Sequence, residues 1–571
     1  MLLMTFFKTL KTLYWLPLLA LAACIQLAAP AAYATDGVAA SRLVSTEWLA
    51  QNLKRAELLI LDASPAQAHA VAHIPGAVSA DYFAYGAQPS TPAQMERRLQ
   101  AWGISAGKKV VLYDMGGTFM ATRLFFDLYV HGVPLADLHL LDGGLAKWRA
   151  GGGAMTKEPT PAPPQGDFRV TRVIDDARAA LPEFLTASGD PRRNALVEAL
   201  EPSWYYGETG FFERAGHVPN ATMLPSVDFF NADKTFKPAG EIRRMLTHLG
   251  ITPEQQVYTY CGGGVAASVP YFAMKFMLGY PQVKLYPGSQ LEWQQDPRGL
   301  PFWTYADPAL MRETPWLKSW GGKMMRMYGI GQVSIIDVRP PAAYQQGHLP
   351  FALNVPADVF RTHWREPAKL AALLGQAGVN VAHEAVVVGE AGLDESAAFA
   401  WLVLQGLGQK KTSIFMDSLE RWAELGQEVS REPTAVGERR TPAEPAVPRT
   451  TYVVAKARAD TVVDAAGAVM ARDLAALERL PAGVYPKVFV ATGRKPPVKA
   501  PPGAFIHLPF NTLLQADGKP KAAKDLWNQI SKAGVPRYAE IVLFADDPGE
   551  AAAAQFIFKL MGFPDVKAVA L

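Results

Sequence analysis

The sequence predicts an α/β protein built from several similar units, because one pattern recurs along its 571 residues. Each copy has a short apolar run that ends in an acid, then a His-apolar-Pro turn, then a second apolar run and a loop of small residues. Strands that alternate with helices indicate parallel sheets flanked by helices on both faces. A chain of this length also exceeds one compact core, so several domains are expected.

Four copies of the pattern predict four domains, at 40–153, 168–305, 316–430 and 450–571. The first three carry the turn clearly, at His73, His217 and His348. In the fourth the turn is degraded to His507-Leu508-Pro509, although two strands and a helix are still expected there. The strands expected in the successive copies lie at 58–62 and 109–113, 195–198 and 256–260, 334–338 and 385–388, and 487–491 and 540–544.

The first 34 residues read as a signal peptide, because Lys8 and Lys11 precede an apolar stretch that small residues follow. Ordinary cleavage would fall before Thr35. Residues 21–24 also resemble a lipoprotein box, in which 1–23 are removed and a lipid on Cys24 tethers the protein to a membrane. An uncleaved anchor is a third alternative, although the apolar core is shorter than the roughly 20 residues that a span needs. Each alternative predicts an exported protein of the periplasm or cell envelope.

The composition limits the kinds of protein and of partner that the sequence allows. The hydrophobic content of 49% and the charged content of 19% are typical of a soluble globular protein. The net charge of +3 is spread along the chain, which argues against a nucleic-acid partner. No His, Cys and Asp cluster has metal-ligand spacing, so we expect neither a metal nor another cofactor.

Cys261 is the residue in this sequence that most clearly indicates chemistry. The predicted strand at 256–260 delivers it to the carboxyl end of a parallel sheet, where ligand sites of such sheets lie. It is the only cysteine outside the signal segment, so it has no partner for an internal disulfide. Three glycines and a predicted helix at 265–278 follow, and their N–H groups are expected to stabilise an anion.

Two interpretations of Cys261 compete. As a nucleophile it would have a lowered thiol pKa, and the loop backbone would hold a persulfide or a bound anion. As a small buried core residue it would be inert. Three consecutive glycines favour the nucleophile. Ordering them on folding costs conformational entropy, and a cysteine that only packs in the core has no need of such a loop. The substrate-binding groups expected around the catalytic Cys261 are Gly262, Gly263, Gly264, Val265 and Ala266.

The order of His-Pro turn, strand, cysteine loop, helix and Gly-Ser or Gly-Gly-Trp closing motif resembles the rhodanese family over most of 40–430. The resemblance implies tandem rhodanese-like domains in which a cysteine takes a sulfane sulfur from a donor, becomes a persulfide and passes the sulfur to cyanide or a thiol. A first domain without cysteine followed by a catalytic second domain is similar to thiosulfate and 3-mercaptopyruvate sulfurtransferases. Cys261 matches their nucleophile.

The loop departs from both donor types of the family. Gly262 and Gly263 supply no cation, whereas thiosulfate-specific members carry Arg and Lys there. Gly263 and Ala266 stand where the mercaptopyruvate type has Ser and Thr. An arginine often found two residues after the acid of the first strand is replaced by Leu200. The donor, thiosulfate or 3-mercaptopyruvate, therefore stays open.

The other copies are expected to be inactive, because a carboxylate cannot carry a persulfide. Asp114 stands at the cysteine position of the first copy, Gly389 or Glu390 at that of the third, and Ala545 or Asp546 at that of the fourth.

The histidines His73, His217 and His348 allow a catalytic or metal-binding interpretation, but their recurrence in copies without cysteine favours a structural one. Similarly, the aromatic residues at 204–206 and 211–212 are expected either to wall the cleft or to pack in the core.

Three other functions compete with small-molecule sulfur transfer. A related cysteine-loop phosphatase would need an arginine at the position of Ala267, which makes phosphoryl chemistry improbable. A non-catalytic scaffold of the cell envelope would make Cys261 vestigial. In the third case Cys261 is active and the acceptor is a protein thiol.

Overall fold

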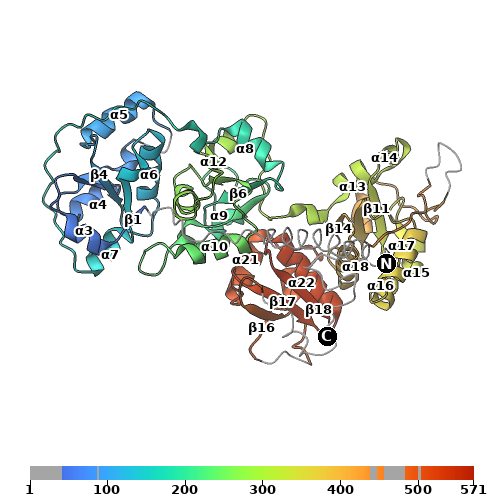
Figure 1. Ribbon diagram of the computed structural model, residues 1–571. Coiled ribbons are helices and arrows are strands. Elements are labelled where there is room, and N and C mark those ends of the chain that lie inside the picture. Colours follow the sequence, from blue (N-terminus) through green and yellow to red (C-terminus); the bar gives the residue numbers. More distant parts are fainter. Residues whose placement is uncertain (1–41, 86–88, 438–445, 455–482, 499–502, 571) are drawn as a thin grey trace, which may run out of the picture.

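The computed structural model describes residues 42–85, 89–437, 446–454, 483–498 and 503–570, whose strands form four parallel β-sheets (Figure 1). The predicted signal peptide, including Cys24, lies outside the described residues. Within those residues no helix is long and apolar enough to cross a membrane. The chain is thus an α/β protein of four repeated units, called the first to fourth unit below.

The first and second units follow each other along the chain. The strands and helices of the first unit are β1 (Leu43–Val44), α3 (Thr46–Asn52), β2 (Leu58–Asp62), α4 (Ala66–Val71), β3 (Val78–Ser79), η1 (Tyr82–Ala84), α5 (Pro92–Ala101), β4 (Lys109–Tyr113), α6 (Met120–Val130), η2 (Leu135–Asp137), β5 (Leu138–Leu141) and α7 (Gly144–Ala150). Those of the second are η3 (Asp175–Ala177), α8 (Leu181–Ser188), β6 (Asn194–Glu198), α9 (Pro202–Tyr205), β7 (Ala221–Met223), η4 (Ser226–Phe229), α10 (Ala239–His248), β8 (Gln256–Tyr260), α11 (Ser268–Phe272), η5 (Ala273–Met277), β9 (Val283–Leu285) and α12 (Ser289–Gln295).

The third and fourth units repeat this arrangement. The third contains η6 (Pro308–Leu310), β10 (Met311–Arg312), α13 (Thr314–Gly321), α14 (Lys323–Met327), β11 (Val333–Asp337), α15 (Pro341–Gln346), β12 (Leu353–Asn354), α16 (Ala357–His363), α17 (Pro367–Gln376), β13 (Glu384–Val388), α18 (Glu395–Gly406), β14 (Lys411–Phe415) and α19 (Leu419–Glu424). The fourth contains β15 (Lys487–Ala491), β16 (Ile506–His507), η7 (Phe510–Leu513), α21 (Ala523–Lys532), β17 (Glu540–Ala545), α22 (Pro548–Leu560) and β18 (Val566–Ala570).

The sheets share one strand order. It is β1-β5-β4-β2-β3 in the first unit and β10-β14-β13-β11-β12 in the third. The second unit, β7-β6-β8-β9, and the fourth, β16-β15-β17-β18, have the same central order without the short edge strand. In all four, the strand that precedes the candidate cysteine position is central and parallel to both neighbours.

Alternating side chains of the central strands enter two separate cores. In the first unit Leu61 and Leu112 pack with α5 and α6, whereas Ile60 and Val111 pack with α3 and α7. Burial on both faces explains why these strands are continuous apolar runs.

The units associate in two similar pairs. Helix α6 of the first unit packs on α11 of the second, and the two units share one buried cluster. Helix α18 of the third unit packs on α22 of the fourth in the same way, and these units share another cluster. The cysteine position of the second unit therefore lies beside the first unit, because α11 begins a few residues after it.

One predicted helix differs from the structure. The sequence predicts a single helix at 265–278, but residues 265–267 form turns, α11 begins at Ser268 and a π-helix follows from Ala273. The N–H groups of Ser268 and Val269 donate to the carbonyls three residues earlier, of Val265 and Ala266, so this stretch has turn rather than α-helical hydrogen bonds.

Candidate active site

Cys261 lies directly after β8, at the carboxyl end of the central strand of the second sheet. Its side chain is 3% exposed. The closing segment of the same unit fixes its backbone: Cys261 N–H donates to Ser289 Oγ at 3.1 Å, and Gln290 N–H donates to the Cys261 carbonyl at 3.0 Å. At Gly264 an added Cβ would lie 2.5 Å from the Pro287 carbonyl oxygen, so the loop requires glycine there.

The loop places hydrogen-bond donors around the sulfur. Backbone N–H groups of Ala267, Gly263 and Gly264 lower the pKa of the Cys261 thiol. Burial has a larger effect and raises this pKa above its usual value, and the nearby Glu198 raises it further. The predicted lowering is therefore wrong in its net direction, because the sequence does not show how deeply the thiol is buried. The donors can still stabilise an anion once it forms.

The first unit braces the cysteine loop. The guanidinium Nη1 of Arg123, on α6, donates to the Gly264 carbonyl at 2.6 Å, and its Nε lies 3.2 Å from an Asp127 carboxylate oxygen. The hydroxyls of Thr122 and Ser268 are 2.8 Å apart across the same contact. Sequence reasoning missed these residues, because nothing in the sequence pairs one unit's helix with another unit's loop.

In two other units, a carboxylate of the chain occupies the equivalent ring of N–H groups. Asp114 accepts from Gly116 N–H at 2.8 Å and from Ala121 N–H at 3.0 Å. In the third unit Asp394 accepts from the N–H groups of Glu390 and Ala397, at 2.8 and 2.7 Å. The N–H groups of these loops are therefore used by a carboxylate of the chain, and the loops have no thiol to carry sulfur.

Glu198, at the end of β6, is a buried carboxyl next to the site. Gln290 Nε2 donates to its Oε2 at 3.1 Å, and hydrogen bonds from the Tyr260 and Gln290 side chains lower the pKa of this carboxyl. Burial raises its pKa from 4.5 to about 8. The equivalent acids have basic partners, since Asp62 lies 2.9 Å from His69 and Asp337 lies 2.6 Å from Arg339.

The aromatic residues of the second unit divide between the two predicted roles. Phe211 is 50% exposed, its ring covers Gly262, and it stacks on Trp204 with ring centroids 3.8 Å apart. Tyr205 and Tyr206 are buried, and the Tyr206 hydroxyl donates to the Met561 carbonyl of the fourth unit at 2.8 Å. Phe211 and Trp204 therefore wall the loop, whereas the two tyrosines pack inside.

The His-Pro turns have the geometry of structural elements. The backbones of His73, His217 and His348 form antiparallel bridges to the segment that closes each unit. Burial lowers the pKa of His217 to about 4, which keeps its ring neutral. Among the described residues, no group of three or more His, Cys, Asp or Glu side chains is arranged to hold a metal ion.

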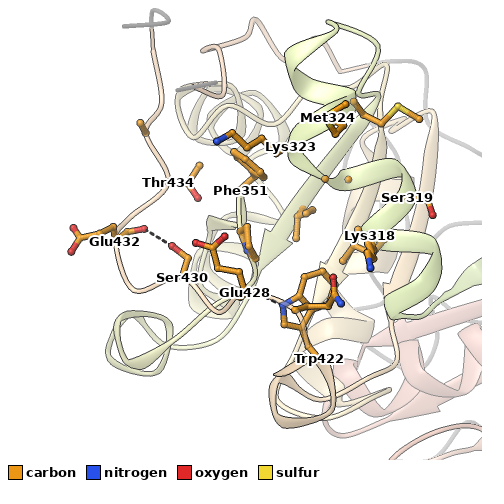
Figure 2. A pocket seen from close by; sticks show the side chains of 18 of the residues that line it. Lys318, Ser319, Lys323, Met324, Phe351, Trp422, Glu428, Ser430, Glu432 and Thr434 are labelled. Atoms are coloured by element: carbon orange, nitrogen blue, oxygen red, sulfur yellow. Dashed lines mark hydrogen bonds between the residues drawn. The ribbon is translucent and has the colours of Figure 1, made fainter. Parts of the chain in front are cut away.

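A cavity of about 700 Å³ lies in the third unit (Figure 2), and Cys261 is not among the residues that line it. Phe351 and Trp422 line it together with Lys318, Lys323 and Glu428, which lie on its walls. Phe351 follows the His348 turn with a φ of 66°, where the first two units have Gly76 and Asn220. A bulky residue in this left-handed conformation is strained.

The rhodanese-like domain model matches residues 45–151, 182–296 and 322–425, which is more than half of the chain. The chain therefore belongs to the rhodanese family. Relatives named thiosulfate and 3-mercaptopyruvate sulfurtransferase, described next, identify it as a sulfurtransferase.

The similar proteins named below match 44–46% of this chain. A sulfur carrier protein of Thermus thermophilus is 31% identical over 267 residues, which cover 44% of this chain and 93% of the relative. A probable 3-mercaptopyruvate sulfurtransferase of Pseudomonas aeruginosa is 32% identical, covering 46% of this chain and 98% of the relative. A thiosulfate sulfurtransferase of the same species is 33% identical, covering 44% and 92%. A solved 3-mercaptopyruvate sulfotransferase of Escherichia coli is 26% identical, covers 44% of this chain and 98% of its own, and has a TM-score of 0.40.

Proposed function

We propose that Cys261 carries a persulfide while sulfur moves from a small-molecule donor to a thiophilic acceptor. One observation supports this most: Cys261 is the cysteine of the described residues, and its sulfur accepts from the backbone N–H groups of a glycine loop at the carboxyl end of β8. In the first and third units, backbone N–H groups of the corresponding loop donate to a carboxylate instead, that of Asp114 or of Asp394. The second unit therefore performs the chemistry.

The transfer has two steps. The Cys261 sulfur attacks the outer sulfur of thiosulfate, the donor's S–S bond breaks, and sulfite leaves with the electron pair. Because burial raises the thiol pKa, Cys261 holds its proton before the reaction, and this proton leaves with the sulfite when Sγ attacks. Cyanide or a thiolate then attacks the outer sulfur and restores the Cys261 thiolate. The N–H groups of Gly263, Gly264 and Ala267 stabilise Sγ in both steps.

The donor belongs to the class of thiosulfate or 3-mercaptopyruvate, the two substrates that the relatives' names give. With 3-mercaptopyruvate the broken bond is C–S, and the carbon takes the proton to give pyruvate. Binding at Gly262, Gly263, Gly264, Val265 and Ala266 would use backbone groups, since none of these side chains carries a charge or a hydroxyl.

Thiocyanate formation from cyanide and each donor tests this function. We expect Cys261→Ser to abolish it, and the matched variant Cys24→Ser, which changes the other cysteine, to keep the wild-type rate. Equal rates in wild type and Cys261→Ser would contradict the proposal. A wild type that forms no thiocyanate with either donor would favour the non-catalytic scaffold. Sulfur that reaches only a protein thiol would identify the acceptor as a protein.

We also propose that the protein is exported to the periplasm or cell envelope, since residues 1–34 have the composition of a signal peptide. The N-terminal sequence of protein purified from the envelope fraction tests this. A terminus at Thr35 indicates ordinary cleavage, and a lipid-modified Cys24 indicates a tether. Full-length protein in the cytoplasm would contradict export.

A further inference from the structure

The cavity of the third unit has the size and the lining of a small-molecule site. Its volume is about 700 Å³ (Figure 2). Leu317, Ile335 and Trp422 line its inner side and belong to one buried apolar cluster of the unit. Phe351, which follows the His348 turn, lines another side. Pockets of this volume, lined mainly by apolar and aromatic side chains with a few polar groups, typically bind small ligands.

One side of the cavity is built by a segment that the first two units lack. Residues 53–57 connect α3 to β2 in the first unit, and residues 189–193 connect α8 to β6 in the second. In the third unit the corresponding connection, from α13 to β11, is longer and spans 322–332. The added residues contain α14, whose Lys323 and Met324 line the cavity.

The strained Phe351 is a second feature that the first two units lack. Gly76 and Asn220, which tolerate a positive φ, stand at this position there, whereas Phe351 has a φ of 66°. Arg326 of α14 holds the ring, because its guanidinium carbon lies 4.8 Å from the ring centre and its Nε donates to the Gly321 carbonyl at 3.1 Å. Backbone strain of this kind is typical of ligand sites. Both differences between the units therefore meet at the cavity.

The polar side chains of the cavity have opposite charges on its two sides. Lys318 and Lys323 come from α13 and α14, whereas Glu428 and Glu432 come from the segment that follows α19 (Figure 2). Trp422 Nε1 donates to the Glu428 carbonyl at 2.8 Å, which fixes that segment against the core. In the part of the chain that the structure describes, none of the four charged side chains forms an ion pair.

We propose that this cavity binds a small zwitterion with an apolar body, which is the chemistry of a short apolar peptide. The ligand's carboxylate pairs with Lys318 and Lys323, and its ammonium pairs with Glu428. Its apolar side chains contact the rings of Phe351 and Trp422. A ligand with one charge alone would leave the opposite side of the cavity unpaired. Cys261 does not line the cavity, so this site is separate from sulfur transfer.

Isothermal titration calorimetry of the full chain with the dipeptide leucyl-phenylalanine tests the proposal. The same dipeptide with an acetylated N-terminus lacks the ammonium, and its C-terminal amide lacks the carboxylate. We expect the free dipeptide to bind and each capped form to bind roughly tenfold more weakly, as for one lost hydrogen bond between charged groups.

Variants of the cavity locate the binding. Replacing both Lys318 and Lys323 by Gln should lower the affinity for the free dipeptide to that for the amide, and should leave the affinity for the amide unchanged. Phe351→Asn should weaken the binding of all three forms. Lys410→Gln is the matched control, because Lys410 is an exposed lysine of the same unit that does not line the cavity. It should bind like the wild type.

Three results would overturn the inference. A wild type that does not bind the free dipeptide refutes the site. Equal affinities for the free and the capped forms refute the recognition of both charges. If the double lysine variant and Phe351→Asn bind as tightly as Lys410→Gln, the dipeptide does not occupy this cavity. Thiocyanate formation by the same wild-type sample reports on the proposed function independently, so failure of one leaves the other standing.

Discussion

Replacing Glu198 by Gln should stabilise the protein at alkaline pH. The native pKa of Glu198 is about 8 and the unfolded value is 4.5. Because the folded pKa is raised, the stability that this group contributes is complete below pH 4.5 and is lost as the pH rises to 8. At about 1.4 kcal/mol per pKa unit, the loss approaches roughly 5 kcal/mol. Glutamine carries no charge and avoids this loss.

Urea unfolding at pH 5, 7 and 9 measures this effect, with a short pulse of alkylation at Cys261 reporting when the second unit opens. We expect the Glu198→Gln and wild-type midpoints to be closest at pH 5 and to diverge as the pH rises. Asp337→Asn is the matched control, because its carboxylate is paired with Arg339. Removing one partner of a buried pair should destabilise the third unit. A gap between Glu198→Gln and wild type that is equal at pH 5 and pH 9 would refute the reasoning.

Three further substitutions test separate features. Arg123→Met leaves the Asp127 carboxylate buried without its cation and should lower the free energy of unfolding by roughly 3–5 kcal/mol, as urea unfolding would measure. An unchanged urea midpoint would contradict the role of this ion pair. Phe351→Asn gives the third unit the residue type of Asn220 and should raise stability by about 1 kcal/mol in thermal unfolding; a lower melting temperature would show that the ring's packing outweighs the strain. Asp114→Ala leaves two loop N–H groups without their acceptor and should lower the free energy of unfolding by about 1–3 kcal/mol. A melting temperature equal to that of the wild type would contradict this.

Much of the fold follows from local patterns that the sequence displays. Strands such as Lys109–Tyr113 and Gln256–Tyr260 are short runs rich in apolar and aromatic residues that lead into glycine-containing loops, so their positions are predictable. The weak fourth copy was also predictable, because β17 and α22 keep the pattern after its turn has degraded. The position of Cys261 between a strand and three glycines likewise identifies the loop.

Contacts between units were beyond sequence reasoning. Arg123 and Gly264 are far apart in the chain, and only the packing of α6 on α11 brings them together. The direction of the Cys261 pKa shift depends on a balance between burial and loop N–H groups, and burial is a property of the assembled pair. The raised pKa of Glu198 has a similar origin, because the burial of a carboxyl group cannot be read from the residues next to it in the sequence.

The central claim is that sulfur resides on Cys261 during transfer. The most direct measurement is the intact mass of the mature protein after incubation with 3-mercaptopyruvate or thiosulfate, beside a Cys261→Ala variant. We expect the wild type to gain one sulfur atom that cyanide removes, and the variant to gain none. A wild type that gains no sulfur from either donor while Cys261 remains alkylatable, or a variant that gains as much as the wild type, would contradict the claim.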